Sequence, residues 1–325
     1  MLLLTLAKHA VAVPVRRALR PWTSGVPRWT TKLEVLVTAL REAFDITARM
    51  SVTERRAALE SLHTPSPLAL RVKRERVDAG GVPGVWFTPP GASAAPVILF
   101  LHGGAYQFGS VRIYTDLICR LALGSRLRVL AIDYRLAPEH PFPAAHEDAM
   151  KAYRYLQAMA SPVVVIGDSA GGNLTISLAL NARDQGLPLP LALVPICPWV
   201  ELGPGGPSRT DNLEHDTLPD VGDAWALTYA AGRPLTDPRI SPLHADLRGL
   251  PPMLVHAGSR EVIRDDVRAF VEKARADGVR VDYSEYEEMI HDWHVLASFG
   301  VPESLRAIEE ICRFVRLGGH AAGTT

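Results

Sequence analysis

Apolar residues near the start of the chain recur with the period of an α-helix. Between positions 33 and 44 they stand three or four residues apart, which gathers them on one face of an amphipathic helix. Ser51 and Glu54 have the spacing of a capping box and predict that a second helix covers 52–62. The proline-containing run at 64–68 ends that helix. The sequence therefore predicts two helices before the first strand.

From position 71 the pattern changes to short runs rich in β-branched residues. The segments 71–78 and 82–88 flank an Ala-Gly-Gly turn and predict an antiparallel hairpin. After it, continuously apolar segments alternate with longer amphipathic ones. The expected strands are 96–102, 126–133, 162–168, 191–196, 251–258 and 279–287, and the expected helices lie near 114–123, 143–159, 170–181, 264–276 and 302–316. Because such strands are buried on both faces, the sequence predicts an α/β fold with a mostly parallel sheet flanked by helices.

One interval breaks this alternation, between the strand that ends near Ile196 and the strand that begins near Pro252. Connections between strands and helices usually have about 2–6 residues, so this interval is an insertion. It contains one helical pattern, at 220–232. Since open α/β sheets bind ligands at the carboxyl ends of their strands, we expect the insertion to form a lid together with the N-terminal helices. The predicted division is an N-terminal helical cap segment at 1–68, an α/β core at 69–198 and 246–325, and a cap insertion at 199–245.

Charge and cysteine content narrow the range of functions. Lys plus Arg equals Asp plus Glu, at 35 each, so the chain lacks the basic excess that phosphate binding needs, and no nucleic-acid partner is expected. Three cysteines lie far apart without a CxxC pair, which argues against a disulfide framework and against structural zinc. A reducing compartment, the cytoplasm, is the simplest location for such a chain.

The N-terminus is apolar at Leu2–Leu6, but its positive charges follow this stretch, whereas those of a signal peptide precede it. We expect the stretch to begin a helix that packs on the protein, and a weak membrane-surface helix is the alternative. No apolar run approaches the roughly 18 residues of a membrane-spanning helix, so stable membrane insertion is not expected.

A candidate nucleophile stands in the pentapeptide Gly167-Asp168-Ser169-Ala170-Gly171, directly after one expected strand and before one expected helix. A G-x-S-x-G sequence in this position is typical of a nucleophile elbow, a tight turn that exposes the serine hydroxyl. The following helix N-terminus offers backbone N–H groups and the positive end of its dipole to a developing oxyanion. The alternative is an ordinary serine in a turn.

A second glycine-rich turn, His102-Gly103-Gly104-Ala105, follows the strand at 96–102. Such a turn can aim backbone N–H groups at a substrate carbonyl, which is the task of an oxyanion hole. We expect the donors to be Gly104, Ala105 and Ala170, with Gly103 allowing the bend. The alternative is a plain glycine turn.

With these two motifs the chain resembles the hormone-sensitive-lipase-like branch of the α/β-hydrolases. A third block, YRLAPEHPFPAA at 134–145, is similar to a signature of that family almost letter for letter. The resemblance covers roughly 70–200 and 235–315, and it departs from the family's HGGG sequence at Ala105. It implies an α/β-hydrolase fold with a helical cap, and a serine carboxylesterase that uses no cofactor and no metal.

The catalytic acid of this fold follows the serine in the chain and precedes the histidine. The family's acid turn resembles G-x-x-D-P-L-x-D, and aligning the Arg-Asp pair at 264–265 with its end places Glu261 at the acid position. A glutamate can serve, because the acid only orients the imidazole and stabilises its cation. Asp265 and then Asp266 are the alternatives, and charge at a helix N-terminus is their other role.

The candidate base is His291, in a turn MIHDWH that looks like the family's MIHGF turn. His294 is the competitor, with helix packing as its other role. A metal site at these two histidines is not expected, because no third ligand stands at a suitable spacing.

Together these residues predict a lidded serine carboxylesterase for short-to-medium-chain esters. Ser169 would attack the ester carbonyl, His291 would take and return the proton, Glu261 would hold His291, and water would release the acyl group. The expected partner is a small-molecule ester, and whether the chain forms a homodimer stays open. Candidate pocket walls, each with core packing as its alternative, are Tyr106, Trp199, Trp225, Tyr229 and Trp293.

Two other functions stay open at this point. A lactonase, amidase or deacetylase acting on a small natural product would use the same triad, so the sequence does not separate it from an esterase. The same branch also resembles a plant hormone receptor that has lost the catalytic histidine and binds a ligand without catalysis. The presence of His291 argues against this second alternative.

Overall fold

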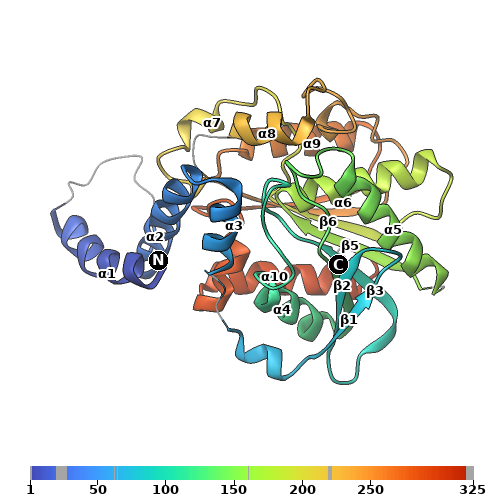
Figure 1. Cartoon of the computed structure of the whole chain (residues 1–325), viewed down its shortest axis with the longest axis horizontal. Helices are drawn as coiled ribbons and strands as arrows, with labels where there is room; N and C mark the ends of the chain where they lie inside the picture. Colours follow the sequence, from blue (N-terminus) through green and yellow to red (C-terminus); the bar gives the residue numbers. More distant parts are fainter. Residues whose placement is uncertain are drawn as a thin grey trace, which may run out of the picture.

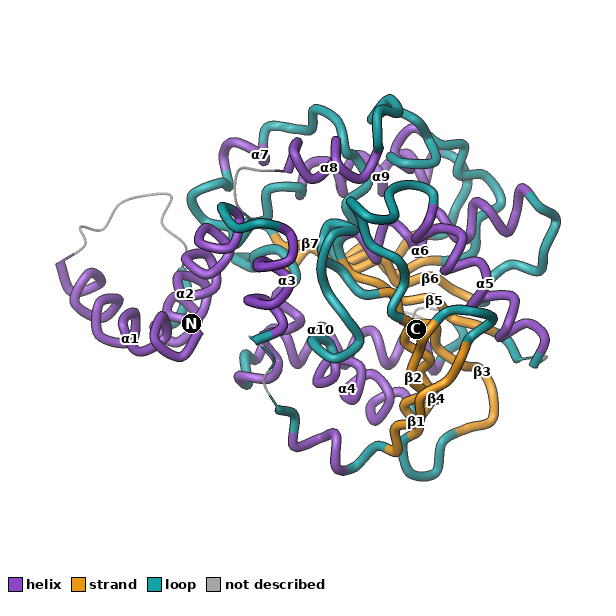
Figure 2. Tube along the Cα trace, in the orientation of Figure 1, coloured by secondary structure: helices purple, strands orange, loops and turns teal. Residues whose placement is uncertain are grey.

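The computed structural model describes residues 2–19, 28–61, 63, 65–159, 161–218 and 222–319. Through the middle of this part of the chain runs an eight-stranded sheet with the order β1-β2-β4-β3-β5-β6-β7-β8 (Figure 2). The strands are β1 (Lys73–Asp78), β2 (Pro83–Thr88), β3 (Ser93–Leu101), β4 (Leu127–Ile132), β5 (Val163–Asp168), β6 (Ala192–Ile196), β7 (Met253–Gly258) and β8 (Val281–Tyr286). The predicted hairpin forms β1 and β2, which are antiparallel, and the strands from β4 to β8 in the sheet order are parallel.

Helices cover both faces of the sheet, as the alternating pattern predicts (Figure 1). One face packs against α4 (Thr115–Ser125) and α10 (Pro302–Arg316). The other packs against α5 (Ala144–Ala158), α6 (Ala170–Asp184) and α9 (Arg264–Ala276). β5, between these layers, is buried at every position, which is why its sequence is continuously apolar up to the elbow.

The N-terminal helices lie at the left of this core and the insertion along its upper edge (Figure 1). The capping box of Ser51 and Glu54 is present and opens α3 (Val52–Glu60). α1 (Leu2–Leu19) contacts α2 (Thr31–Ala48), where Lys8 and His9 lie 2.8 and 2.6 Å from carboxylate oxygens of Glu42. The remaining elements are η1 (Pro67–Leu70), α7 (Ser208–Asp211), α8 (Gly222–Ala230), η2 (Pro242–His244) and η3 (Trp293–Phe299).

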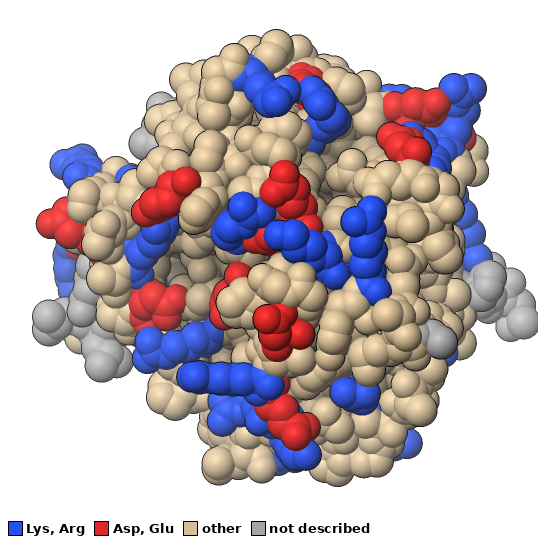
Figure 3. Space-filling view, turned by 45° about the vertical axis from the view of Figure 1, so that its right-hand side comes forward, with Lys and Arg blue, Asp and Glu red and all other residues tan. Residues whose placement is uncertain are grey.

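Surface properties agree with the balanced composition. On the face shown in Figure 3, basic and acidic side chains are interspersed, without a large area of one sign. None of the helices in the described ranges is both long enough and apolar enough to cross a membrane.

The central position of β3 leads to a stability prediction. Leu99 is fully buried in the middle of the sheet, whereas Leu70 is 91% exposed. We expect Leu99→Ala to lower the free energy of unfolding by about 2–5 kcal/mol, because a cavity replaces buried methyl groups. The matched change Leu70→Ala is expected to alter it by less than about 0.5 kcal/mol. Urea unfolding midpoints measure both, and equal effects would contradict this position of β3.

Candidate active site

Ser169 occupies the turn between β5 and α6 with φ 53° and ψ −117°, a backbone conformation that non-glycine residues rarely adopt. The two flanking glycines make this turn sterically possible. A Cβ at Gly171 would collide with the carbonyl oxygen of Leu101, and a Cβ at Gly167 would collide with the backbone of Gly171. The geometry is that of a nucleophile elbow, and Ser169 lines the main cavity.

The glycine-rich turn after β3 lies beside the elbow. The N–H of Gly103 donates to Asp168 Oδ1 at 3.0 Å, so Gly103 provides space and not a free donor. In the part of the chain described, the N–H groups of Gly104, Ala105 and Ala170 donate to no protein acceptor. Gly104 has φ 121° and Ala105 has φ 50°, so the alanine adopts a left-handed conformation that its Cβ disfavours.

Asp168 links these two turns, a role that the sequence did not reveal. Its carboxylate accepts the Gly103 N–H, and the Tyr114 hydroxyl donates to it at 2.5 Å. Burial raises the pKa of Asp168 well above its usual range, and the nearby Asp292 adds to the effect. The only sequence signal was an acidic residue next to the nucleophile, whereas Tyr114 comes from a distant segment.

Glu261 and His291 meet behind the elbow as a fully buried pair. Glu261 Oε2 lies 2.9 Å from His291 Nδ1, and the Gly258 N–H donates to Oε1 at 3.1 Å. Burial raises the pKa of Glu261 to about 7, although His291 opposes this shift. Asp265 and Asp266 instead face the insertion: they accept the N–H groups of Ser208 and Gly206 and pair with arginines.

The second nitrogen of His291 points elsewhere. Nε2 lies 3.2 Å from Asp292 Oδ2 and forms no hydrogen bond with any described residue. Burial alone would lower the pKa of His291, but the carboxylates of Asp292 and Glu261 outweigh it and raise this pKa well above its usual range. The competitor His294 turns away from the elbow, and its Nε2 lies 3.0 Å from Nδ1 of His256.

Two residues of the insertion hold the loops that carry this pair. The carboxylate of Asp216 accepts the Val262 N–H and the His291 N–H, both at 2.8 Å. The side-chain amide of Asn212 donates to the Glu261 carbonyl at 2.9 Å. Sequence reasoning missed both residues, because they stand in a polar stretch whose composition is that of any exposed loop. Burial raises the pKa of Asp216, and its hydrogen bonds with backbone N–H groups oppose this shift.

A cavity of about 740 Å³ opens above the elbow and contains Ser169 and His291 in its wall. α2, α3 and the insertion contribute mainly apolar side chains to it, among them Phe44, Leu59 and Leu213. Trp199 and Trp225 line the cavity as expected.

The other three aromatic residues do not line this cavity, so their prediction as pocket walls was wrong. Tyr106 stacks on Tyr229 with ring centroids 3.8 Å apart and donates to Asn173 Oδ1. Trp293 is fully buried against His294. These three residues pack in the core, which was the alternative to a place in the pocket wall.

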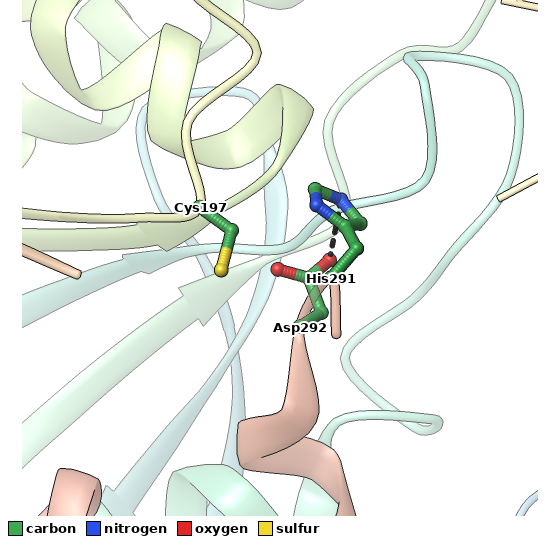
Figure 4. Close-up of side chains that lie close together, drawn as sticks. All are labelled: Cys197, His291 and Asp292. Atoms are coloured by element: carbon green, nitrogen blue, oxygen red, sulfur yellow. Dashed lines mark ion pairs between the residues drawn. The ribbon is translucent and has the colours of Figure 1, made fainter. Parts of the chain in front are cut away.

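One group of side chains at the site has the chemistry of metal ligands. Cys197, His291 and Asp292 each offer a ligand atom, and these atoms lie within 4.8 Å of one another (Figure 4). Cys197 follows β6 and is buried. His294, which the sequence paired with His291 as a hypothetical metal site, does not belong to this group.

Comparisons with known proteins agree with this fold. A family model described as the alpha/beta hydrolase fold matches residues 98–295. The chain is 41% identical over 232 residues to an acetyl-hydrolase of Streptomyces hygroscopicus, covering 70% of this chain and 77% of that protein. It is 32% identical over 282 residues to carboxylesterase NlhH of Mycobacterium tuberculosis, covering 80% and 88%. A solved esterase of the bacterial hormone-sensitive lipase family shares 37% identity with a TM-score of 0.82, covering 86% and 97%.

The contacts of Asp216 generate a prediction. Asp216→Asn removes the charge and replaces one of the two acceptor oxygens by an NH₂ group that cannot accept, so at least one of the two loops should shift. We expect kcat/KM for a soluble ester to fall at least tenfold, since a hydrogen bond to a charged group contributes about 1.5–3 kcal/mol. Asp211→Asn, at an exposed position of α7, is the matched control and should leave kcat/KM unchanged. Equal activities of the two variants would contradict a role for Asp216 in holding the loops.

Proposed function

This chain belongs to the α/β-hydrolases of the hormone-sensitive-lipase type and is a carboxylic ester hydrolase. We propose that it acts through a triad of Ser169, His291 and Glu261 and forms an acyl-enzyme intermediate. The observation that carries the proposal is the arrangement at the cavity. Ser169 stands in a nucleophile elbow, and His291 lies in the same cavity wall. Oε2 of Glu261 lies 2.9 Å from Nδ1 of His291.

In the first half of the reaction, Ser169 Oγ bonds to the ester carbonyl carbon and its proton passes to His291 Nε2. The carbonyl π electrons move to oxygen, and the free N–H groups of Gly104, Ala105 and Ala170 are the donors in reach of that oxyanion. When the oxyanion collapses, the ester C–O bond breaks and Nε2 returns the proton to the departing alcohol. Water then repeats these steps on the acyl-enzyme and releases the acid.

To act as the base, His291 has to turn its Nε2 atom away from Asp292 and toward Ser169. When His291 is neutral, the Nδ1–H bond to Glu261 favours the tautomer with its lone pair on Nε2. Catalytic hydrogen bonds of a free enzyme often become short only when substrate is bound, which agrees with the absence of a Ser169–His291 hydrogen bond here.

The cavity favours short-to-medium acyl chains. Its volume of about 740 Å³ suits a small molecule, and leucine, phenylalanine and tryptophan side chains contribute to its walls. A second candidate function is deacetylation of a small natural product, because the acetyl-hydrolase of Streptomyces hygroscopicus is 41% identical to this chain. The triad would serve both, so substrate assays distinguish them.

Replacing the nucleophile is the first test. We expect Ser169→Ala to retain less than about 1% of the esterase activity, because catalysis without a nucleophile falls by several orders of magnitude. The thermal midpoint should stay close to that of the unaltered protein. A sulfonyl fluoride should label the unaltered protein once and the variant not at all, and labelling of the variant would place the nucleophile elsewhere.

The acid is tested by two charge-neutralising substitutions of similar size. Glu261→Gln should lower kcat by about 10³–10⁴, because the amide no longer fixes the tautomer of His291 or balances its charge. Asp265→Asn should change kcat little, since Asp265 binds the insertion and arginine side chains. Initial rates on a butyryl ester measure both, and a crippled Asp265→Asn beside a normal Glu261→Gln would overturn the assignment.

Chain-length preference is the third test. Each buried CH₂ contributes roughly 0.8 kcal/mol while the cavity has room, so kcat/KM should rise to an optimum at about four to eight acyl carbons and then fall. Trp225→Ala should move the optimum to longer chains, whereas Tyr229→Phe, behind the wall, should not. A preference for palmitoyl esters, or a jump in rate on emulsified substrate, would contradict an enclosed cavity.

A further inference from the structure

Three side chains from two loops converge beside the elbow (Figure 4). Cys197 follows β6, and His291 with Asp292 follows β8. One ligand atom from each lies within 4.8 Å of the others. In the proposed hydrolysis neither the thiol of Cys197 nor the carboxylate of Asp292 reacts with the substrate.

The donor set suits a thiophilic divalent cation. Thiolate, imidazole and carboxylate are the ligands of protein-bound Zn²⁺, with bonds of about 2.0–2.3 Å. Ligand atoms of a tetrahedral site with such bonds stand roughly 3.5 Å apart, so inward shifts of about 1 Å close this site.

The tautomer of His291 is the one that metal binding needs. A ligating histidine usually donates its other N–H to a carboxylate, and Glu261 accepts from Nδ1 at 2.9 Å. Nε2 is buried and has no hydrogen-bond partner among the described residues, and Oδ1 of Asp292 is in the same state. Apart from the ion pair between Nε2 and Asp292 Oδ2 at 3.2 Å, the described residues satisfy neither atom.

The surrounding charge also favours a cation. Carboxylate oxygens of Glu261 and Asp292 lie 2.9 and 3.2 Å from the two ring nitrogens of His291, and within the described ranges neither residue forms an ion pair with Lys or Arg. A bound dication would compensate this excess of carboxylates. His291 and Asp292 line the cavity, which gives the ion a route to the site.

We infer that Cys197, His291 and Asp292 form a binding site for a thiophilic divalent cation such as Zn²⁺, and that the bound ion inhibits the enzyme. Binding releases the thiol proton, and the Nε2 proton where the imidazole is charged, and forms metal–sulfur, metal–nitrogen and metal–oxygen bonds. Inhibition rests on the proposed role of His291, because the ion occupies the lone pair that would take the serine proton. Binding does not rest on that role.

The first experiment measures binding without activity. Co²⁺ is added to the Ser169→Ala protein, which keeps all three ligands. We expect one ion per chain, with the charge-transfer absorption of a thiolate–Co²⁺ bond and the visible bands of a tetrahedral site. Zn²⁺ should displace the Co²⁺ and abolish both signals. Absence of the charge-transfer band would overturn the site even if Ser169 proved not to be the nucleophile.

The second experiment compares variants by calorimetric titration with Zn²⁺. Cys197→Ser and Asp292→Asn should each weaken binding by at least about 100-fold, since even groups outside the coordination shell change metal affinity 10–100-fold. Cys312→Ser is the matched control: this thiol is also buried but lies on α10, and its loss should leave the affinity unchanged. Unchanged affinity in Cys197→Ser would overturn the proposal, as would equal loss in the control.

The third experiment tests inhibition in the active enzyme. Zn²⁺ should lower kcat/KM for a soluble ester, a chelator should restore it, and Asp292→Asn should require at least about 100-fold more Zn²⁺ for the same effect. Inhibition that is equally strong in Asp292→Asn would show that the ion acts elsewhere. Circular dichroism of each variant establishes that it is folded.

Discussion

The hydrogen bond between Glu261 Oε2 and His291 Nδ1 constrains the rest of the site. Both side chains are buried, and burial raises the pKa of Glu261 to about 7, so the carboxylate stays ionised only while its partners remain in place. The two loops that carry the pair follow different strands, β7 and β8. Asp216, from the insertion, binds a backbone N–H of each loop at 2.8 Å. The insertion therefore holds the loops of the proposed triad and also contributes to the wall of the cavity.

Most of the fold and the turn that carries Ser169 could be predicted from the sequence, because their signals are local. A buried parallel strand has a continuously apolar sequence, and an amphipathic helix has a period of 3.6, so each can be recognised without its neighbours. The elbow is likewise a single turn of five residues at 167–171, whose glycines are required by contacts with the backbone of Leu101 and of the turn itself. Element ends differed from expectation by a few residues, as for β3, which begins at Ser93 instead of 96.

The rest depended on contacts between distant segments. Tyr114 binds Asp168 across 54 positions, and Asp216 binds His291 across 75. No spacing rule connects such pairs, since only the strand order brings them together. The aromatic side chains show the same limit. The sequence does not distinguish Tyr106 from Trp225, but Tyr106 packs in the core and Trp225 lines the cavity. The packing of the insertion on the core decides which of these side chains faces the cavity.

The chemistry of His291 follows from the different partners of its two ring nitrogens, which are Glu261 at Nδ1 and Asp292 at Nε2. With Nδ1–H given to Glu261, Nε2 is the ring atom that gains and loses the proton, and Asp292 adds negative charge 3.2 Å away. A site of this kind attracts any proton donor or cation, so electrostatics alone does not select the serine hydroxyl. Selection comes from position. The left-handed backbone of Ser169, with φ 53°, projects its hydroxyl into the cavity wall that also holds His291. Conformational strain in the elbow thereby provides the selectivity that charge does not.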